Sequence, residues 1–232
     1  EHITAHGYRV YTLSRSATDA ANAVADRIDF SVDLSDPDAR STGISRLCSA
    51  IRNRGDTDRL YLINNAARLD PMGRLSEASA EDVHKSIELN LAAVIDLSMQ
   101  AVELAGELGC SLDILNVTSG AAGRPISGLA MYCSTKAAVD MFTRVLASEH
   151  QGITHPRVRI IAVSPGMVET SMQLALRESG DEVLDAHPFR SAHDKGQVRS
   201  PEAAAEKLLA ALHNDAVSSG SVMHIRDLEH GS

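Results

Sequence analysis

The feature that most constrains the fold of this chain is a regular alternation of short apolar runs with longer amphipathic segments. Six runs rich in Val, Ile and Leu have the pattern of buried strands: 9–14, 28–34, 59–65, 112–119, 157–166 and 221–225. Segments with helical periodicity separate them. This alternation predicts an α/β fold, a doubly wound and mostly parallel sheet with helices on both faces. Because we find no repeat and no low-complexity linker, we expect a single domain over 1–232.

Several of the expected helices carry a recognisable start. Asp36 precedes Pro37, which suits an N-cap followed by proline at the first helical position. Ser79 begins the segment 79–109 in the same manner, and Ser200-Pro201 repeats the signal near the end of the chain. In a sheet of this type, ligands bind beyond the carboxyl ends of the strands, so the residues that end the strands are the first candidates for a site.

Composition narrows the classes of function. The net charge of −9 comes without any Lys/Arg block, which argues against nucleic acid as a partner. The apolar runs are too short to span a bilayer and no signal peptide is visible, so we expect no membrane and a cytoplasmic protein. Three cysteines without CxxC spacing suit a reducing compartment. The histidines lack acidic or cysteine partners at ligand spacing, so we expect no metal.

The beginning of the chain has an unexpected pattern. Residues 1–15 resemble the last turns of a helix, a stop at Gly7 and then a strand. A doubly wound nucleotide-binding fold places a strand, a glycine-rich turn and the start of that helix before this point. The chain starts at Glu1 rather than Met, so we expect roughly 20–25 preceding residues, with the first strand and the phosphate-binding turn among them.

The strand ends offer candidates for chemistry at a carbonyl group. Tyr132 and Lys136 are four residues apart in a helical pattern, so both project from one helix face. Ser119 ends the strand 112–119, thirteen residues before Tyr132, and Asn90 lies inside the helix expected over 79–109. Alone, a Tyr-x-x-x-Lys spacing is common and has little specificity. The other residues must decide its meaning.

Taken together, these motifs resemble the short-chain dehydrogenase/reductase family. The shared motifs follow the family's order: an Asn-Asn-Ala motif at 64–66, the in-helix Asn90, Ser119, Tyr132-Cys-Ser-Thr-Lys136 and the Pro-Gly-x-Val-x-Thr segment 165–170. The resemblance covers essentially the whole chain and implies a Rossmann-type fold and an oxidoreductase.

The resemblance also implies roles for four catalytic residues. Tyr132 would donate the proton, and Lys136 would favour its phenolate, lowering the Tyr132 pKa, and bind the nicotinamide ribose. Ser119 would hold the substrate oxygen. Asn90 would hold a water that connects Lys136 to solvent.

Cofactor contacts follow the same resemblance. Ser14 and Arg15 end the strand 9–14, where no acidic residue stands to read a ribose 2′-hydroxyl, so NADP(H) is favoured over NAD(H). Asp33 and Leu34 resemble the family's adenine contact, although Asp33 could also be a simple turn former. Further contacts would come from Asn64 and Ala66 at the ribose, and from Pro165, Gly166, Val168 and Thr170 at the carboxamide and phosphates. The chain departs from the family at Ala67, where glycine is usual.

Within the family, segments 131–149 and 164–179 resemble sepiapterin reductases and bacterial benzil reductases. This similarity implies an NADPH-dependent reductase of one carbonyl of a vicinal dicarbonyl, with an aromatic or alkyl α-diketone as the favoured substrate. A pteridine substrate remains the alternative, although His224 stands where pteridine-reducing members carry an acidic residue. The segment 171–200, with Met172, Leu174, Leu176 and Phe189, has the pattern of a mobile lid or of a surface excursion over the core.

Two non-enzyme functions remain open. The chain could be an NADP-sensing module, since the fold permits binding without turnover. It could also be a structural subunit. The long helices 79–109 and 130–151 would pair across a two-fold axis, as they do in the family, so a homodimer or homotetramer is expected in either case.

Overall fold

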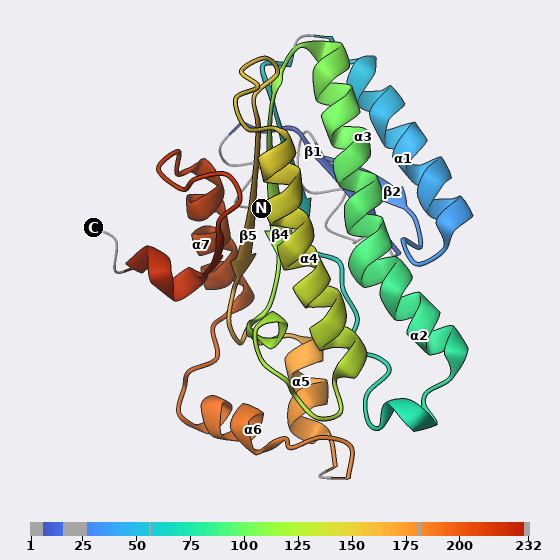
Figure 1. Cartoon of the computed structure of the whole chain (residues 1–232), viewed down its shortest axis with the longest axis vertical. Coiled ribbons are helices and arrows are strands. Elements are labelled where there is room, and N and C mark those ends of the chain that lie inside the picture. The colour runs from blue at the N-terminus through green and yellow to red at the C-terminus, as the bar shows by residue number, and fades with distance from the viewer. Residues whose placement is uncertain (1–6, 16–26, 56, 181, 230–232) are drawn as a thin grey trace.

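The computed structural model describes residues 7–15, 27–55, 57–180 and 182–229, and it has the expected α/β architecture (Figure 1). The strands are β1 Val10–Ser14, β2 Arg27–Ser31, β3 Arg59–Asn64, β4 Ser111–Val117, β5 Val158–Ser164 and β6 Val222–His224. The helices are α1 Pro37–Arg52, α2 Ala80–Ile87, α3 Ala93–Leu108, α4 Ala130–Glu149, α5 Ser171–Glu178, α6 His187–Asp194 and α7 Pro201–His213. All strand pairings are parallel, which confirms the predicted fold class.

The core shows why the central strands are apolar throughout. In β4 and β5, Leu112, Ile114 and Ile160 pack with side chains of α3 and α4 on one face of the sheet. Leu115 and Ile161 point to the opposite face and pack against α7. Successive strand residues alternate between faces, so a strand covered by helices on both sides needs apolar residues at nearly every position.

The predicted helix starts are confirmed. Asp36 caps α1 by accepting backbone N–H bonds from Asp38 and Ala39, with Pro37 in the first turn. Ser79 caps α2 and Ser200 caps α7 in the same way. The long helix expected over 79–109 is confirmed as the helical run Ala80–Leu108, in which a π-helical turn over Glu88–Ala92 lies between α2 and α3.

The pairings among the described strands fall into two groups. The order is β1-β2 in one sheet and β3-β4-β5-β6 in the other. Among the described residues, no strand pairs with the second edge of β1 or of β3. Both strands line a cavity of about 1470 Å³, which we call the inter-sheet slot. Apolar side chains of α1 and α3, including Ile44 and Leu97, complete its wall.

The run Ala80–Leu108 is long and apolar enough to cross a membrane by length and composition alone, contrary to the expectation from the apolar runs. Within the fold, however, it behaves as a core helix. It packs against α1, α4 and the strands β3 and β4, and it buries the polar side chains of Ser86, Asn90 and Ser98 inside the protein.

Candidate active site

Three of the predicted catalytic residues lie together at the carboxyl end of β4. Ser119 follows β4 and caps the short 3-10 turn Gly120–Ala122, with its Oγ accepting a bond from the Ala121 N–H at 3.2 Å. Tyr132 enters from the first turn of α4, and the Ser119 side chain lies close enough to influence the Tyr132 pKa. The Lys136 Nζ lies 5.9 Å from the centroid of the Tyr132 ring. Residues from motifs that are separate in the sequence thus lie together in space.

Lys136 is buried, with an exposed fraction of 3%. Its Nζ donates a hydrogen bond of 2.8 Å to the carbonyl of Val117, the last residue of β4. Burial lowers the pKa of Lys136 to about 8, against an upward influence of the Asp140 carboxylate one helical turn away. The amine is therefore close to its titration point near neutral pH, which suits a group that exchanges protons.

The electrostatics of Tyr132 differ from the expectation. We expected Lys136 to lower the pKa of Tyr132, but burial raises that pKa above its usual value of 10, and the neighbouring Ser119 side chain only partly opposes the rise. The physical reason is that removal from water disfavours the phenolate, while burial also weakens the charge of Lys136. In this structure Tyr132 is a neutral phenol, the form that can donate a proton.

Asn90 lies in the π-helical turn and is fully buried. Its Oδ1 accepts a bond of 2.8 Å from the backbone N–H of Arg68, and its Nδ2 donates to the Arg68 carbonyl at 2.9 Å. The same Nδ2 reaches the Thr135 hydroxyl at 3.2 Å, one residue before Lys136. The amide therefore ties the segment after β3 to α4. Its predicted role in holding a water stays a prediction.

Asn64 ends β3, but its side chain belongs to a buried polar ladder. Its Nδ2 donates to Asn116 Oδ1 at 2.8 Å and reaches the Ser98 hydroxyl at 3.3 Å. Asn116 in turn donates to the Thr143 hydroxyl at 2.9 Å. Asn116 was not among the predicted site residues, although an amide in the otherwise mostly apolar run 112–117 is a visible signal. Any contact of Asn64 with a ribose would therefore use its backbone, next to the exposed Ala66.

The residues predicted for the adenine end gather at the ends of β1 and β2. The Ser14 carbonyl accepts a bond from the Val32 N–H at 2.9 Å, and Arg15 is exposed. Asp33 lies close enough to feel the Arg15 charge, and hydrogen bonds from Ser35 are the largest cause that lowers the Asp33 pKa. Leu34 is buried beside them. An exposed guanidinium at a strand end is a suitable group for a phosphate.

The segment after β5 lies at the same edge of the sheet. It comprises Pro165, Gly166, Val168 and Thr170, and Thr170 caps α5 by accepting a bond from the Gln173 N–H. Gly166 has a positive φ of 75°, and a Cβ at this position would lie 3.2 Å from Nε2 of His224, at the end of β6. Glycine thus allows the His224 ring to lie directly against this turn.

An apolar cluster surrounds Tyr132. Leu129, Leu176, Leu184 and Phe189 are buried in it, and Met172 packs against it. Leu176 belongs to α5 and Phe189 to α6, so the segment 171–200 covers Tyr132, as both a lid and a surface excursion over the core would; Leu174, in contrast, is exposed.

The cover is held closely against the site. Gly128, in the loop before α4, has a φ of 84°, and a Cβ there would lie 2.2 Å from the carbonyl oxygen of Val183.

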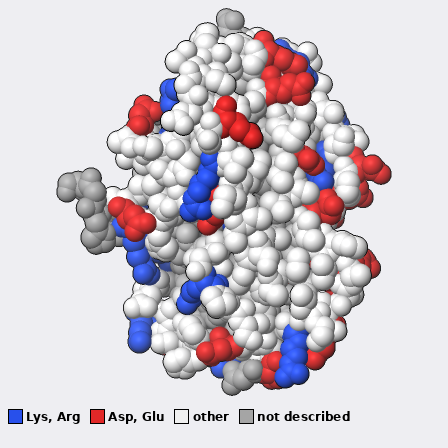
Figure 2. All heavy atoms as spheres, in the orientation of Figure 1, with Lys and Arg blue, Asp and Glu red and all other residues white. Residues whose placement is uncertain are grey.

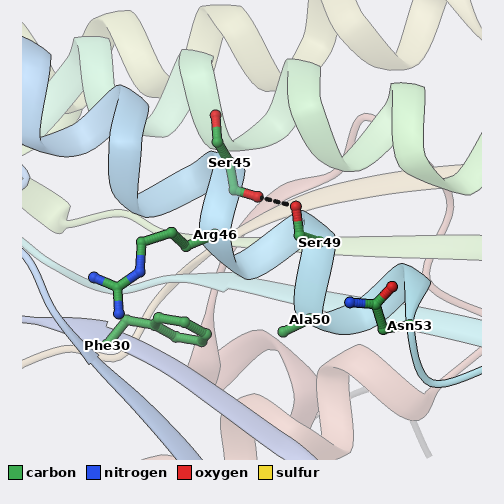
Figure 3. A pocket seen from close by; sticks show the side chains of 6 residues that line it. All are labelled: Phe30, Ser45, Arg46, Ser49, Ala50 and Asn53. Carbon is green, nitrogen blue, oxygen red and sulfur yellow. Dashed lines mark hydrogen bonds between the residues drawn. The ribbon is translucent and has the colours of Figure 1, made fainter.

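A separate surface pocket of about 420 Å³ lies between β2 and α1 (Figure 3). Arg46 lies over the Phe30 ring at 5.5 Å, and Ser49 donates to the Ser45 carbonyl. None of the predicted site residues lines it. Within the part of the chain that the structure describes, no three His, Cys, Asp or Glu side chains come together as a metal site.

Comparison with known proteins decides the family. Residues 1–181 match the family of short chain dehydrogenases. The chain belongs to this family. A benzil reductase ((S)-benzoin forming) of Bacillus subtilis is 33% identical over 95% of this chain and 89% of that protein. A sepiapterin reductase of Rattus norvegicus is 30% identical over 81% of this chain and 72% of that protein.

Solved structures show the same short-chain dehydrogenase fold. A short chain dehydrogenase/reductase from Saccharomyces cerevisiae superposes with a TM-score of 0.77, at 23% identity over 95% of this chain and 87% of the other. The protein ElxO, solved with NADPH bound, gives a TM-score of 0.75 at 20% identity, over 97% of this chain and 89% of the other. The predicted family and fold are therefore confirmed, and the chain is an oxidoreductase with benzil and sepiapterin reductases among its relatives.

Proposed function

We propose that this short-chain dehydrogenase is an NADPH-dependent carbonyl reductase that acts on one carbonyl of a small aromatic or alkyl vicinal dicarbonyl. The observation that carries the proposal is the grouping of the Ser119 side chain and Tyr132 with the buried amine of Lys136, at the margin of an apolar cluster. A polar proton-transfer group against apolar walls suits a substrate with a reactive carbonyl and hydrocarbon substituents.

The described residues fit a phosphorylated dinucleotide at the carboxyl edge of the strands. Arg15 and Ser14 would hold the 2′-phosphate, with Asp33 and Leu34 at the adenine. Ala66, Lys136 and the segment Pro165–Thr170 would hold the nicotinamide end. When bound, NADPH supplies the hydride that reduces the carbonyl carbon.

The chain itself supplies the proton. As the carbonyl carbon is reduced, its oxygen gains negative charge, and the Tyr132 hydroxyl donates its proton to that oxygen, which leaves an alcohol and a phenolate. Ser119, whose side chain lies near Tyr132, would donate to the same oxygen and stabilise the developing charge. The proton lost by Tyr132 is restored by way of Lys136, whose pKa of about 8 lets it gain and release protons near neutrality.

The relatives favour the dicarbonyl over other carbonyl substrates. The benzil reductases and the sepiapterin reductases are each named for a substrate, and a substrate of either kind would have to fit beside Tyr132 in this chain. A pteridine-type reductase is the second candidate, supported by the sepiapterin reductases. His224, which lies against Gly166 at the same edge, argues against a pteridine substrate, because an acidic group would pair better with an amino-pyrimidine.

The decisive experiment is a turnover assay. We expect the purified protein to consume NADPH, followed by its absorbance, with benzil and phenylpropanedione and to work poorly with NADH. Tyr132→Phe should lower kcat by about a hundredfold or more, because the ring keeps its packing but cannot donate a proton. Tyr61→Phe is the matched control, since Tyr61 lies in β3 and contacts Tyr8 and His213 instead of the site.

The outcomes separate the candidates. Turnover of sepiapterin but not of diketones would mean that the substrate is a pteridine and not a small dicarbonyl. NADPH binding without turnover of any carbonyl, unchanged in Tyr132→Phe, would indicate the NADP-sensing module and contradict the reductase.

A further inference from the structure

Arg40, in the first turn of α1, has contacts that the catalytic proposal does not use. Its exposed fraction is only 4%. Its Nη1 donates to the Leu34 carbonyl at 2.7 Å, its Nη2 to Glu88 Oε2 at 2.9 Å and its Nε to Asp96 Oδ2 at 2.8 Å. One side chain thus joins the segment after β2 to the α2–α3 run.

This geometry makes full use of a guanidinium. The planar fork presents donors in three fixed directions, and each direction here meets a different acceptor. The two carboxylates compensate the buried charge, which would otherwise be costly. A lysine at position 40 would keep the positive charge but could not donate hydrogen bonds in all three of these directions.

The place of the contact suggests more than stabilisation. Leu34 follows Asp33 directly, and these are the two residues that the proposed function assigns to the adenine. Ser35 holds Asp33 by local bonds at 2.6 and 2.9 Å, and the Leu34 side chain lies in an apolar cluster with Ala93 of α3. Arg40 adds a polar connection to the same helical run, because it holds the Leu34 carbonyl and also pairs with Glu88 and Asp96.

We propose that Arg40 is a positioning residue for the adenine end of the dinucleotide. It holds the Leu34 carbonyl inward, so that the Asp33–Leu34 turn is set before the adenosine arrives. Less ordering is then needed on binding, and affinity rises. The inference rests on the proposed function, because it requires that a dinucleotide binds at this edge.

The catalytic end has anchors of its own. Asn90 is two residues from Glu88 but is fixed by the Arg68 backbone and Thr135. A change at Arg40 should therefore weaken cofactor binding and leave the chemical step nearly unchanged. An ion pair that only stabilised the fold would have no reason to weaken cofactor binding while leaving the chemical step unchanged.

The test uses Arg40→Lys, with Arg159→Lys as the matched control. Arg159 is comparably buried, at 5%, and likewise pairs with a carboxylate, Asp113, and with backbone carbonyls, including that of Val217. It lies in the second residue of β5, at the opposite end of the strand from Ser164 and the site. Binding of adenosine 2′,5′-bisphosphate and of NADPH is measured by calorimetry, and kcat at saturating NADPH in the dicarbonyl assay.

We expect Arg40→Lys to raise both dissociation constants about tenfold, with kcat changed less than twofold. Arg159→Lys should lower the melting temperature without changing either dissociation constant. If Arg40→Lys does not fold, Asp96→Asn provides the milder variant, with an expected loss of about threefold in affinity.

Each outcome has one meaning. Wild-type affinity in a folded Arg40→Lys protein, or an equal loss in Arg159→Lys, overturns the role of Arg40. If the wild-type protein binds neither ligand, the proposed cofactor fails and the inference fails with it. If both ligands bind but no carbonyl is reduced, only the proposed reaction fails, and the affinity comparison still decides the role of Arg40.

Discussion

At the scale of single residues, burial controls the proton chemistry of this site. Tyr132 and Lys136 are both almost inaccessible, and burial is the largest cause of the change in each pKa. It disfavours the phenolate and the ammonium alike, so both side chains move toward their neutral forms. A ligand that brings negative charge to the site would favour the ammonium again, which links the state of Lys136 to cofactor binding.

The lowered pKa of Lys136 predicts a specific dependence of stability on pH. Below about pH 8, folding must bury an ammonium, or the amine must lose its proton, and either costs free energy. Between pH 8 and 10.5 the unfolded chain holds this proton and the folded chain does not, so the contribution of Lys136 to stability improves as the pH rises through this window.

The measurement is urea unfolding of the wild-type protein and of Lys136→Met at pH 8 and at about pH 9.5. The difference between the two free energies of unfolding should shift by up to about 1.5 kcal/mol in favour of wild type. Cys48 and Cys110, whose buried thiols have raised pKa values, act in the opposite direction in both proteins and cancel. A difference that does not vary with pH would contradict the lowered pKa.

At the scale of elements, the inter-sheet slot lies between β1 and β3. Among the described residues, each of these two strands pairs with a partner on one side only. Free edges of parallel strands present backbone donors and acceptors, and the slot is lined by leucine and isoleucine side chains. An added extended strand would satisfy both the hydrogen-bonding groups and the apolar walls.

At the scale of the whole molecule, α3 and α4 offer a surface for self-association. Met99 on α3 and Met141 and Val145 on α4 have exposed fractions of 57%, 57% and 47%. Figure 2 shows a broad area with few charged side chains over the middle of the face that these helices present in Figure 1. Exposed apolar side chains gathered on two helices are typical of an interface between copies.

We expect a homodimer or homotetramer that Met141→Glu breaks, because a carboxylate in an apolar two-fold interface faces its own copy and must lose its hydration. Light scattering after gel filtration would show the lower mass. Leu75→Glu, at a residue that is 49% exposed on a short 3-10 turn away from both helices, should leave the mass unchanged. A wild-type monomer at all concentrations would contradict this assembly.

The sequence by itself determined the strand and helix order and the helix caps at Asp36, Ser79 and Ser200, which follow from periodicity and from local capping chemistry. The grouping of Ser119, Tyr132 and Lys136 was implied by the resemblance of the sequence motifs to the short-chain dehydrogenase/reductase family. Only the tertiary structure decided the rest. It buried Tyr132 and so raised its pKa, enclosed Asn64 in a polar ladder with Asn116, and brought Arg40 to Leu34 and Asp96. It also separated β1 from β3. Burial and pairing between distant segments depend on contacts that no local pattern encodes, because they arise only when the whole chain packs.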